Sequence, residues 1–312
     1  MENSYSRRDL LAKSAVVASA APLVWTANHA AMGGESTRPV DTDATPTFRY
    51  CLNTGTIRGQ KLTLPQQIEV TARAGYDAIE LWVGDLSRYV ESGGSLDVLR
   101  KQIVDSGLTV ESAIGFARWI VDDPQERQQG LEDAKRDMDL LAQIGGKRIA
   151  APPAGANRQA GLDLWQVADR YRALLEIGDQ TGVVPQLENW GSSATLSRLA
   201  EVALVTVACG HARACLLPDV YHMYRGDSDF HGLKLISGRS IHVFHVNDYP
   251  ASPAREQLND SHRVYPGDGV APWNLILQTI KSNGFKGFLS LELFNREYWS
   301  QDASQVARTG LA

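Results

Sequence analysis

From residue 47 onwards, short apolar runs alternate with longer amphipathic segments. The apolar runs are rich in Val, Ile and Leu, and most are too short for helices, which is typical of strands that are buried on both faces. The eight predicted strands are Phe48–Leu52, Ala78–Val83, Leu108–Gly115, Arg148–Ala151, Val183–Glu188, Ala214–Asp219, Ile241–Val246 and Phe288–Leu293.

The segments between these runs place apolar residues at helical spacing, near i, i+3, i+4 and i+7. Many of them are followed by glycine, which adopts the left-handed conformation past a helix end without a steric penalty. The predicted helices are Leu64–Ala74, Leu96–Ser106, Glu126–Ile144, Leu164–Thr181, Leu196–Ala208, Phe230–Ile236 and Trp273–Ser282. Few residues follow the last strand, so an eighth helix, near Ala303–Leu311, must be short or incomplete.

This repeat of strand and helix predicts an α/β fold, a (β/α)8 TIM barrel with a short or incomplete eighth helix, over residues 47–312. A doubly wound open sheet is the competing architecture. That fold often carries a glycine-rich phosphate loop after its first strand, and the segment Asn53–Gly59 does not have the GxGxxG pattern. The barrel is therefore favoured.

The first residues differ in character from the barrel. Two arginines, Arg7 and Arg8, precede the apolar run Ala15–Trp25, an order typical of a twin-arginine export signal. That run is too short to cross a bilayer as a helix. We expect an export signal over residues 1–32, a polar linker over residues 33–46 and a periplasmic or otherwise exported barrel. A cytoplasmic amphipathic leader is the alternative.

Charge and cysteine content exclude some classes of function. The net charge of −5 gives no basic footprint for nucleic acid. No later segment reaches membrane-spanning length, so we expect no stable membrane association after export. Cys209 and Cys215 can pair in an oxidising compartment, but Cys51 would be left over. We favour three small apolar core residues over a disulfide scaffold.

The last four predicted strands end in side chains that bind metals. Glu188, Asp219, His245 and Glu292 stand at or near the ends of strands five to eight. Catalytic residues of a TIM barrel come from the carboxyl ends of its strands, so these four are expected around one mouth. Three carboxylates there would repel one another without a cation. The pattern predicts one divalent metal bound by these four residues.

Two short motifs show a resemblance to a known family. The stretch Asp219-x-x-His222-Met223 and the turn Pro266-Gly267-Asp268-Gly269, followed by Pro272-Trp273, resemble the xylose isomerase-like barrel superfamily. Within it, the chain is most similar to the sugar phosphate isomerase/epimerase group, which includes ketose 3-epimerases and inosose isomerases. The resemblance covers about residues 47–310.

The resemblance also implies roles for individual residues. Glu188, Asp219, His245 and Glu292 match the four metal ligands of the family, and Glu188 and Glu292 match its catalytic base and acid. His222 matches a contact to a substrate hydroxyl. An arginine shortly before the Pro-Gly turn binds substrate in the family, and the match here is Arg263, with Arg255 in reserve.

The ligand types indicate a metal and a reaction. Three carboxylates and one imidazole favour Mn²⁺, with Mg²⁺ or Co²⁺ as alternatives. Glu188 and Glu292 can flank opposite faces of a flat enediolate, so that one removes a proton and the other returns it. The predicted function is a metal-dependent isomerase or epimerase of a keto sugar, acting through a metal-bound enediolate. A lyase or dehydratase acting on 3-keto glycosides or keto-cyclitols with the same site is the alternative.

Other readings of these residues stay open. Asp219 can also cap the following helix, and Asp248 can either orient a ligand histidine from the second shell or cap a turn. Glu80, inside the second strand, is a weaker candidate for the site. Trp82, Trp119 and Trp190 either line a sugar pocket or pack the barrel.

Two unrelated functions are disfavoured. An abasic-DNA endonuclease shares this barrel but needs histidines from the early strands, and before residue 188 the chain has only His29. A binding protein without activity is disfavoured because all four ligand positions are filled. We expect a small carbohydrate as partner, no nucleic acid, and a homo-oligomer as an open option.

Overall fold

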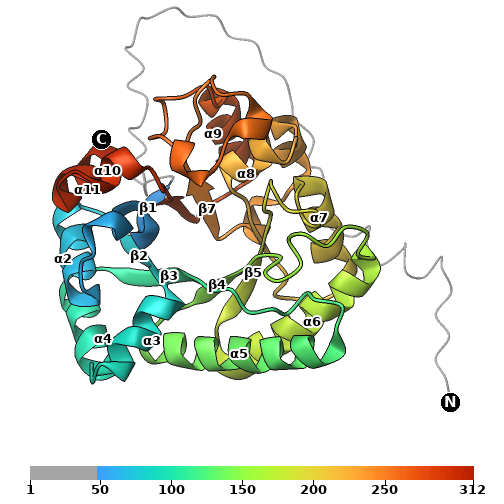
Figure 1. Ribbon diagram of the computed structural model, residues 1–312, viewed down its shortest axis with the longest axis horizontal. Helices are drawn as coiled ribbons and strands as arrows, with labels where there is room; N and C mark the ends of the chain where they lie inside the picture. Colours follow the sequence, from blue (N-terminus) through green and yellow to red (C-terminus); the bar gives the residue numbers. More distant parts are fainter. Residues whose placement is uncertain (1–47) are drawn as a thin grey trace, which may run out of the picture. The chain divides into compact units, whose positions relative to one another are not determined.

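A computed structural model describes residues 48–312 (Figure 1). The predicted export signal and linker lie outside these residues. The described chain contains eight short strands whose pairings are all parallel. They are β1 (Arg49–Asn53), β2 (Ala78–Trp82), β3 (Thr109–Ile114), β4 (Arg148–Ala151), β5 (Val184–Glu188), β6 (Leu216–Leu217), β7 (Val243–Val246) and β8 (Phe288–Leu291). Each lies within one residue of a predicted strand or inside it.

The strands follow one another around a barrel. One sheet has the order β3-β2-β1-β8-β7 and the other the order β4-β5-β6. Two isolated bridges, Leu216 to Ile241 and Asp219 to His245, connect β6 with β7. Between β3 and β4, the Lys147 amide donates to the Val110 carbonyl over 3.2 Å. Because β1 pairs directly with β8, the predicted TIM barrel is confirmed.

Helices surround the strands on the outside (Figure 1). They are α2 (Leu64–Ala74), α4 (Leu96–Asp105), α5 (Pro124–Gln143), α6 (Leu164–Thr181), α7 (Leu199–Ala208), α9 (Trp273–Ser282) and α11 (Ala303–Leu311). Helix α6 begins at a side-chain cap from Asp163 and ends at Gly182, whose φ of 80° is left-handed. The short eighth helix is α11, with the predicted bounds. It packs on the barrel, where the Tyr76 hydroxyl donates to the Ala307 carbonyl.

Some short elements were not predicted from the sequence. These are η1 (Thr54–Gln60), α3 (Val83–Glu91), α8 (Val220–Arg225), η3 (Gly238–Ser240), η4 (Arg255–Gln257), η5 (Asp260–His262) and α10 (Arg296–Trp299). The predicted α-helix Phe230–Ile236 was wrong in type, because this segment forms the 3₁₀ helix η2 (Phe230–Leu235). Its six residues include Gly232, and such short segments adopt 3₁₀ geometry readily. Strand β6 is shorter than predicted at both ends, and at its C-terminal end it stops before Pro218, which has no amide hydrogen for pairing.

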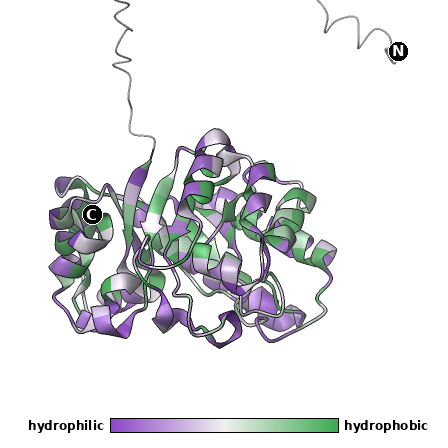
Figure 2. Cartoon of the chain, turned by 90° about the horizontal axis from the view of Figure 1, so that it is seen from above, coloured by the Kyte–Doolittle hydropathy of each residue, from purple (hydrophilic) through white to green (hydrophobic). Residues whose placement is uncertain are grey.

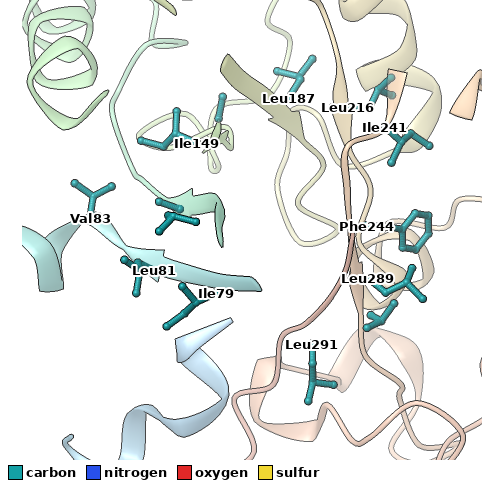
Figure 3. Close-up of a cluster of buried hydrophobic side chains, with 14 of the residues drawn as sticks. Ile79, Leu81, Val83, Ile149, Leu187, Leu216, Ile241, Phe244, Leu289 and Leu291 are labelled. Atoms are coloured by element: carbon teal, nitrogen blue, oxygen red, sulfur yellow. The ribbon is translucent and has the colours of Figure 1, made fainter. Parts of the chain in front are cut away.

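Side chains alternate between the two faces of the barrel wall. One face packs against the helices through residues such as Leu81, Leu187, Phe244 and Leu289 (Figure 3). The other face fills the barrel interior with a small apolar cluster: Cys51, Ala78, Ile114, Ala150, Leu217, Val243 and Phe288. Residues two positions further along the strands share this inner face, which places Glu80, His245 and Ser290 inside the barrel.

The hydropathy of the outer helices and the state of the cysteines bear on the sequence-based expectations. The outer helices carry both hydrophilic and hydrophobic residues (Figure 2). Within the described part of the chain, no helix is both long and apolar enough to cross a membrane. All three cysteines are buried and free, as expected for small core residues.

Candidate metal centre and active site

Four predicted ligands meet at the carboxyl ends of strands β5 to β8. His245 is fully buried, and its Nδ1 lies 3.4 Å from Glu292 Oε2, 3.6 Å from Asp219 Oδ2 and 3.8 Å from Glu188 Oε1. Glu188, His245 and Glu292 each offer a ligand atom within 4.8 Å of the others. The strand ends therefore bring all four residues together.

The ligand atoms of Glu188, His245 and Glu292 lie close enough together for one divalent cation, and Asp219 is not part of this mutually close group. Donor atoms about 2.1 Å from a single ion lie at most about 4.2 Å apart. The three distances from His245 Nδ1 to the carboxylates satisfy that limit. His245 Nδ1 itself is buried without a hydrogen-bond partner among the described residues, which is costly unless a cation or a proton compensates.

The other nitrogen of the His245 ring is held by Glu80. Glu80 Oε2 accepts from His245 Nε2 over 2.9 Å, from Ser290 Oγ over 2.7 Å and from Asn53 Nδ2 over 2.9 Å. A carboxylate on the outer nitrogen fixes the tautomer and leaves Nδ1 free to bind a metal. Asn53 Nδ2 also donates to Glu292 Oε1 over 3.0 Å, so it links two residues of the site.

We expect Glu80→Gln to weaken Mn²⁺ binding by about 10- to 100-fold, because the variant keeps the shape of the side chain and removes its charge. Isothermal titration calorimetry measures this effect. The matched control is Glu111→Gln, which changes another buried carboxylate, one that pairs with Lys147 and Arg148. Equal losses in both variants would rule out a specific role for Glu80.

Arg263 lies among the ligands. Its Nη1 donates to Asp219 Oδ2 over 2.9 Å and to Glu292 Oε2 over 2.8 Å. Its Nη2 donates to His222 Nε2 over 3.1 Å and to Asp260 Oδ1 over 2.7 Å. Both predicted substrate-binding residues therefore lie beside the candidate metal site. Arg255, the reserve choice, pairs instead with Asp227.

Asp219 has two structural roles at once. Its Oδ1 accepts from the His222 amide over 2.7 Å and caps helix α8, as the alternative reading proposed. Its Oδ2 accepts from Asn247 Nδ2 and Arg263 Nη1 and faces His245. Capping therefore fixes the carboxylate with its Oδ2 facing His245.

The contacts of Asp248 favour the alternative that it caps a turn over the prediction that it orients a ligand histidine. Its Oδ1 accepts from the amides of Tyr249 and Ala271, and its Oδ2 accepts from the Gly267 amide and Trp273 Nε1. Asp248 thus organises the Pro-Gly turn, which was the other reading. The residue that orients His245, a candidate metal ligand, is Glu80, because its position in β2 shares the inner face with His245.

A cavity of about 520 Å³ opens above the ligands. Glu188, Glu292, His222 and Arg263 line it. Five aromatic residues surround part of its wall, and polar residues from the segment 259–261 line another part. A cavity of this size, with a few convergent polar groups at its base, is typical of a small-molecule site.

Comparison with known proteins identifies the fold family. The family model for the xylose isomerase-like TIM barrel matches residues 68–312. The chain belongs to the xylose isomerase-like TIM barrel family.

Relatives of this xylose isomerase-like chain include several enzymes. An inosose isomerase from Bacillus velezensis is 25% identical over 269 residues, covering 84% of this chain and 94% of the relative. A 3-dehydroshikimate dehydratase from Pseudomonas aeruginosa is 29% identical over 259 residues, covering 80% of this chain but only 39% of the dehydratase. The 3-dehydro-D-guloside 4-epimerase from Escherichia coli is 25% identical over 233 residues, covering 70% of this chain and 83% of the epimerase.

Solved structures agree with this fold. The crystal structure of the IolI protein with a bound zinc atom matches with a TM-score of 0.77 at 22% identity, covering 85% of this chain and 95% of that one. Together, the relatives place this xylose isomerase-like barrel among isomerases, epimerases and dehydratases.

Burial and charge shift the pKa values of the acids in different directions. Burial raises the pKa of Glu188 well above its usual range and raises that of Glu292 to about 7. Burial would also raise the pKa of Asp219, but the charge of Arg263, together with the hydrogen bond and charge of His245, outweighs it and holds that pKa far below its usual range. Burial lowers the pKa of His222 to about 4, so its imidazole is neutral at pH 7.

Metal affinity is expected to fall as the pH drops through about 7. A carboxylate must lose its proton before it binds a cation, and the pKa of Glu292 is about 7 while that of Glu188 is also raised. Below this pH, each proton displaced costs up to about tenfold in affinity per pH unit. Calorimetric titration with Mn²⁺ between pH 5.5 and 8 checks this, and a flat profile would contradict it.

The raised pKa of Glu292 also determines how the folding stability of the metal-free protein changes with pH. Between about pH 4.5 and 7, folded Glu292 keeps a proton that it loses in the unfolded chain. The stability of the metal-free protein therefore falls as the pH rises through this window.

Several site residues were not assigned from the sequence. Asn53 and Ser290 are polar residues in apolar strands, at the inner positions of β1 and β8. Their inward position was readable from the alternation of the strands. Asp260, at the start of η5, pairs with Arg263 three residues later, and the sequence analysis did not assign it a role.

Proposed function

We propose that this chain is a divalent-metal-dependent isomerase or epimerase of a keto sugar or a related keto carbohydrate. The observation that carries this proposal is the convergence of Glu188 and Glu292 on one buried histidine nitrogen at the base of a cavity. The enzyme classes of the relatives support the same reading.

A bound divalent ion would polarise the substrate carbonyl and acidify the neighbouring C–H bond. Glu188, Asp219, His245 and Glu292 would hold that ion. We favour Mn²⁺, with Mg²⁺ or Co²⁺ as alternatives, because three of the four donors are carboxylates. The zinc atom bound in the IolI structure supports the binding of a divalent ion by a protein of this fold.

The two glutamates would carry the proton transfer. Glu188 ends β5 and Glu292 follows β8, so their carboxylates approach the cavity from different sides of the barrel mouth. One carboxylate takes the proton from the carbon next to the carbonyl, leaving an enediolate, and the other glutamic acid returns a proton to the opposite face. Hydrogen bonds from Asn53 and Arg263 fix the Glu292 carboxylate for this role.

His222 and Arg263 would position the substrate. The raised pKa of Arg263 keeps it charged, because Asp219, Asp260 and Glu292 outweigh its burial. Its guanidinium donates to His222 Nε2, which orients the neutral ring with the cavity beside it. The ring can then form a hydrogen bond with a substrate hydroxyl.

Elimination is the second candidate reaction, favoured by the 3-dehydroshikimate dehydratase relative. The same proton abstraction forms an enediolate, and a substituent on the β-carbon can then leave. The C–H and C–O bonds break, a C=C bond forms, and the leaving group departs as water or an alcohol after taking a proton. A 3-keto glycoside or a keto-cyclitol carries such a substituent.

Deuterium uptake tests the proposal. The protein is loaded with Mn²⁺ and incubated in D₂O with inososes, ketohexoses and 3-keto glucosides, and NMR identifies each exchanged C–H. Exchange that stops when EDTA removes the metal supports enolisation, and the product separates epimerisation from elimination. Stoichiometric metal without exchange in any keto carbohydrate would refute the proposal.

We also propose that the chain is exported through the pair Arg7 and Arg8. The order of twin arginine and apolar run supports this. The expected result is that wild-type protein is found in the periplasm and that Arg7→Lys with Arg8→Lys keeps it in the cytoplasm. Equal distribution of both forms in cell fractionation would contradict export by this route.

A further inference from the structure

Five aromatic side chains line one side of the cavity: Trp82, Phe116, Trp190, Phe294 and Trp299. We call this set the aromatic arc. None of its members is buried, and Phe116 is 47% exposed. Large apolar side chains that gather at one hollow and stay partly exposed are typical of a binding surface.

The arc is continuous and begins at the proposed site. Trp190 lies beside His222, with ring centroids 6.4 Å apart. From there, neighbouring centroids follow at 6.1 Å to Phe116, 5.3 Å to Trp82, 5.9 Å to Phe294 and 6.4 Å to Trp299. The five rings therefore form a connected chain of aromatic contacts along one side of the cavity.

Hydrogen bonds hold two of the indoles in place. Trp82 Nε1 donates to Asn53 Oδ1 over 3.0 Å, and Trp299 Nε1 donates to the Gly55 carbonyl over 3.1 Å. Asn53 also contacts Glu292, so the position of Trp82 is tied to the proposed catalytic residue. A wall fixed in this way loses little side-chain entropy when a ligand binds.

The cavity is too large for one hexose alone. Twelve non-hydrogen atoms, at the ~30 Å³ that a water molecule occupies in the liquid, fill about 360 Å³. This generous allowance leaves part of the 520 Å³ cavity free. The free part has room for a further group.

Charge in the cavity argues against a phosphorylated substrate. Arg263 already forms ion pairs with Asp219, Glu292 and Asp260. The other cationic side chain that lines the cavity is Arg296, which is exposed. A phosphate is normally held by several donors or by a helix N-terminus, and one solvated arginine is a weak substitute.

We propose that the aromatic arc binds the second ring of a neutral two-ring substrate, whose keto ring lies between Glu188 and Glu292. This inference rests on the proposed function and specifies its substrate class as keto glycosides. The second ring offers an apolar face to the arc, and both an aryl group and a second sugar have such a face. The segment 259–261 provides the polar side of the cavity.

Equilibrium binding tests the arc without relying on turnover. Methyl 3-keto-β-glucoside, phenyl 3-keto-β-glucoside and 3-keto-cellobiose are each titrated into Mn²⁺-loaded protein and followed by tryptophan fluorescence. The two-ring ligands are expected to bind about tenfold more tightly than the methyl glucoside. Comparing the phenyl and cellobiose ligands shows whether the second ring is aryl or sugar. Equal affinity for all three, or binding of none, would overturn the proposal.

Two variants locate the effect. Phe116→Ala, at an exposed position, is expected to bring the affinity ratio of phenyl to methyl glucoside close to one. Trp165→Ala is the matched control, because Trp165 is 67% exposed on α6 and is not among the residues lining the cavity. It should leave the ratio unchanged. A ratio that survives Phe116→Ala would contradict a role for the arc.

Deuterium exchange separates this inference from the proposed function. If two-ring ligands bind tightly but exchange no deuterium, the binding role of the aromatic arc is supported and the proposed enolisation is refuted. If deuterium exchange occurs with equal kcat/KM for the methyl and phenyl glucosides, the enolisation chemistry is supported and the binding role of the aromatic arc is refuted.

Discussion

Replacing either Glu188 or Glu292 by glutamine is expected to stop epimerisation, with a loss of about 10² to 10⁴-fold in rate. The amide keeps the size of the side chain and its ability to contact Arg263 or the metal, but it cannot accept the substrate proton. Mn²⁺ binding has to be saturated in both variants, because each glutamate is also a proposed ligand. Glu297→Gln, at an exposed position in α10, is the matched control and should keep full activity.

If Glu188 and Glu292 act on opposite faces of the substrate, the two variants should differ in which epimer exchanges deuterium. Each variant retains one base, so it should still exchange deuterium into the one epimer whose proton faces that base. Glu188→Gln and Glu292→Gln should therefore exchange opposite epimers while neither converts one into the other. NMR of each purified epimer in D₂O measures this. Loss of exchange with both epimers in both variants would show that the glutamates do not act as two independent bases.

Removing Arg263 is expected to destabilise the metal-free protein by about 3–5 kcal/mol. Arg263 is 1% exposed and donates to the buried carboxylates of Asp219 and Glu292. Arg263→Met keeps much of the volume and leaves these charges without their counter-ion. Urea unfolding in EDTA measures the loss. Arg296→Met, at the exposed edge of the cavity, should change stability by less than about 0.5 kcal/mol.

The metal should offset part of this loss. A divalent cation neutralises the same oxygens that Arg263 contacts, so Mn²⁺ is expected to stabilise Arg263→Met more than the wild-type protein. Unfolding with and without Mn²⁺ gives both values. A smaller metal effect in the variant would mean that Arg263 supports the ion rather than sharing its ligands.

Most of the fold follows from a local pattern that the sequence displays. Strands buried on both faces produce short apolar runs, and the glycines after the helices mark where each helix ends. The exceptions have local causes as well. Strand β6 stops before Pro218, and Gly232 with a short segment gives a 3₁₀ turn instead of an α-helix.

The site was predictable as far as it lies on strand ends. Glu188, Asp219, His245 and Glu292 follow from the register of four strands, since a barrel brings successive ends together. The partner of His245 was not settled, because Asp248 is close in sequence whereas Glu80 is 165 residues away. Sequence proximity favoured Asp248, whereas the inner-face alternation of β2 favours Glu80.

Contacts made by loops could not be inferred in the same way. Phe116 and Phe294 complete the aromatic arc from segments without regular periodicity. Their positions depend on how the loops after different strands pack against one another. Such packing has no local signature in the chain.

Anomalous diffraction from crystals of the Mn²⁺-loaded protein tests the metal centre most directly. We predict one strong peak at the manganese edge within bonding distance of Glu188, Asp219, His245 Nδ1 and Glu292. A peak elsewhere, or none at this position after saturation with Mn²⁺, would contradict the metal site and the proton transfer that depends on it.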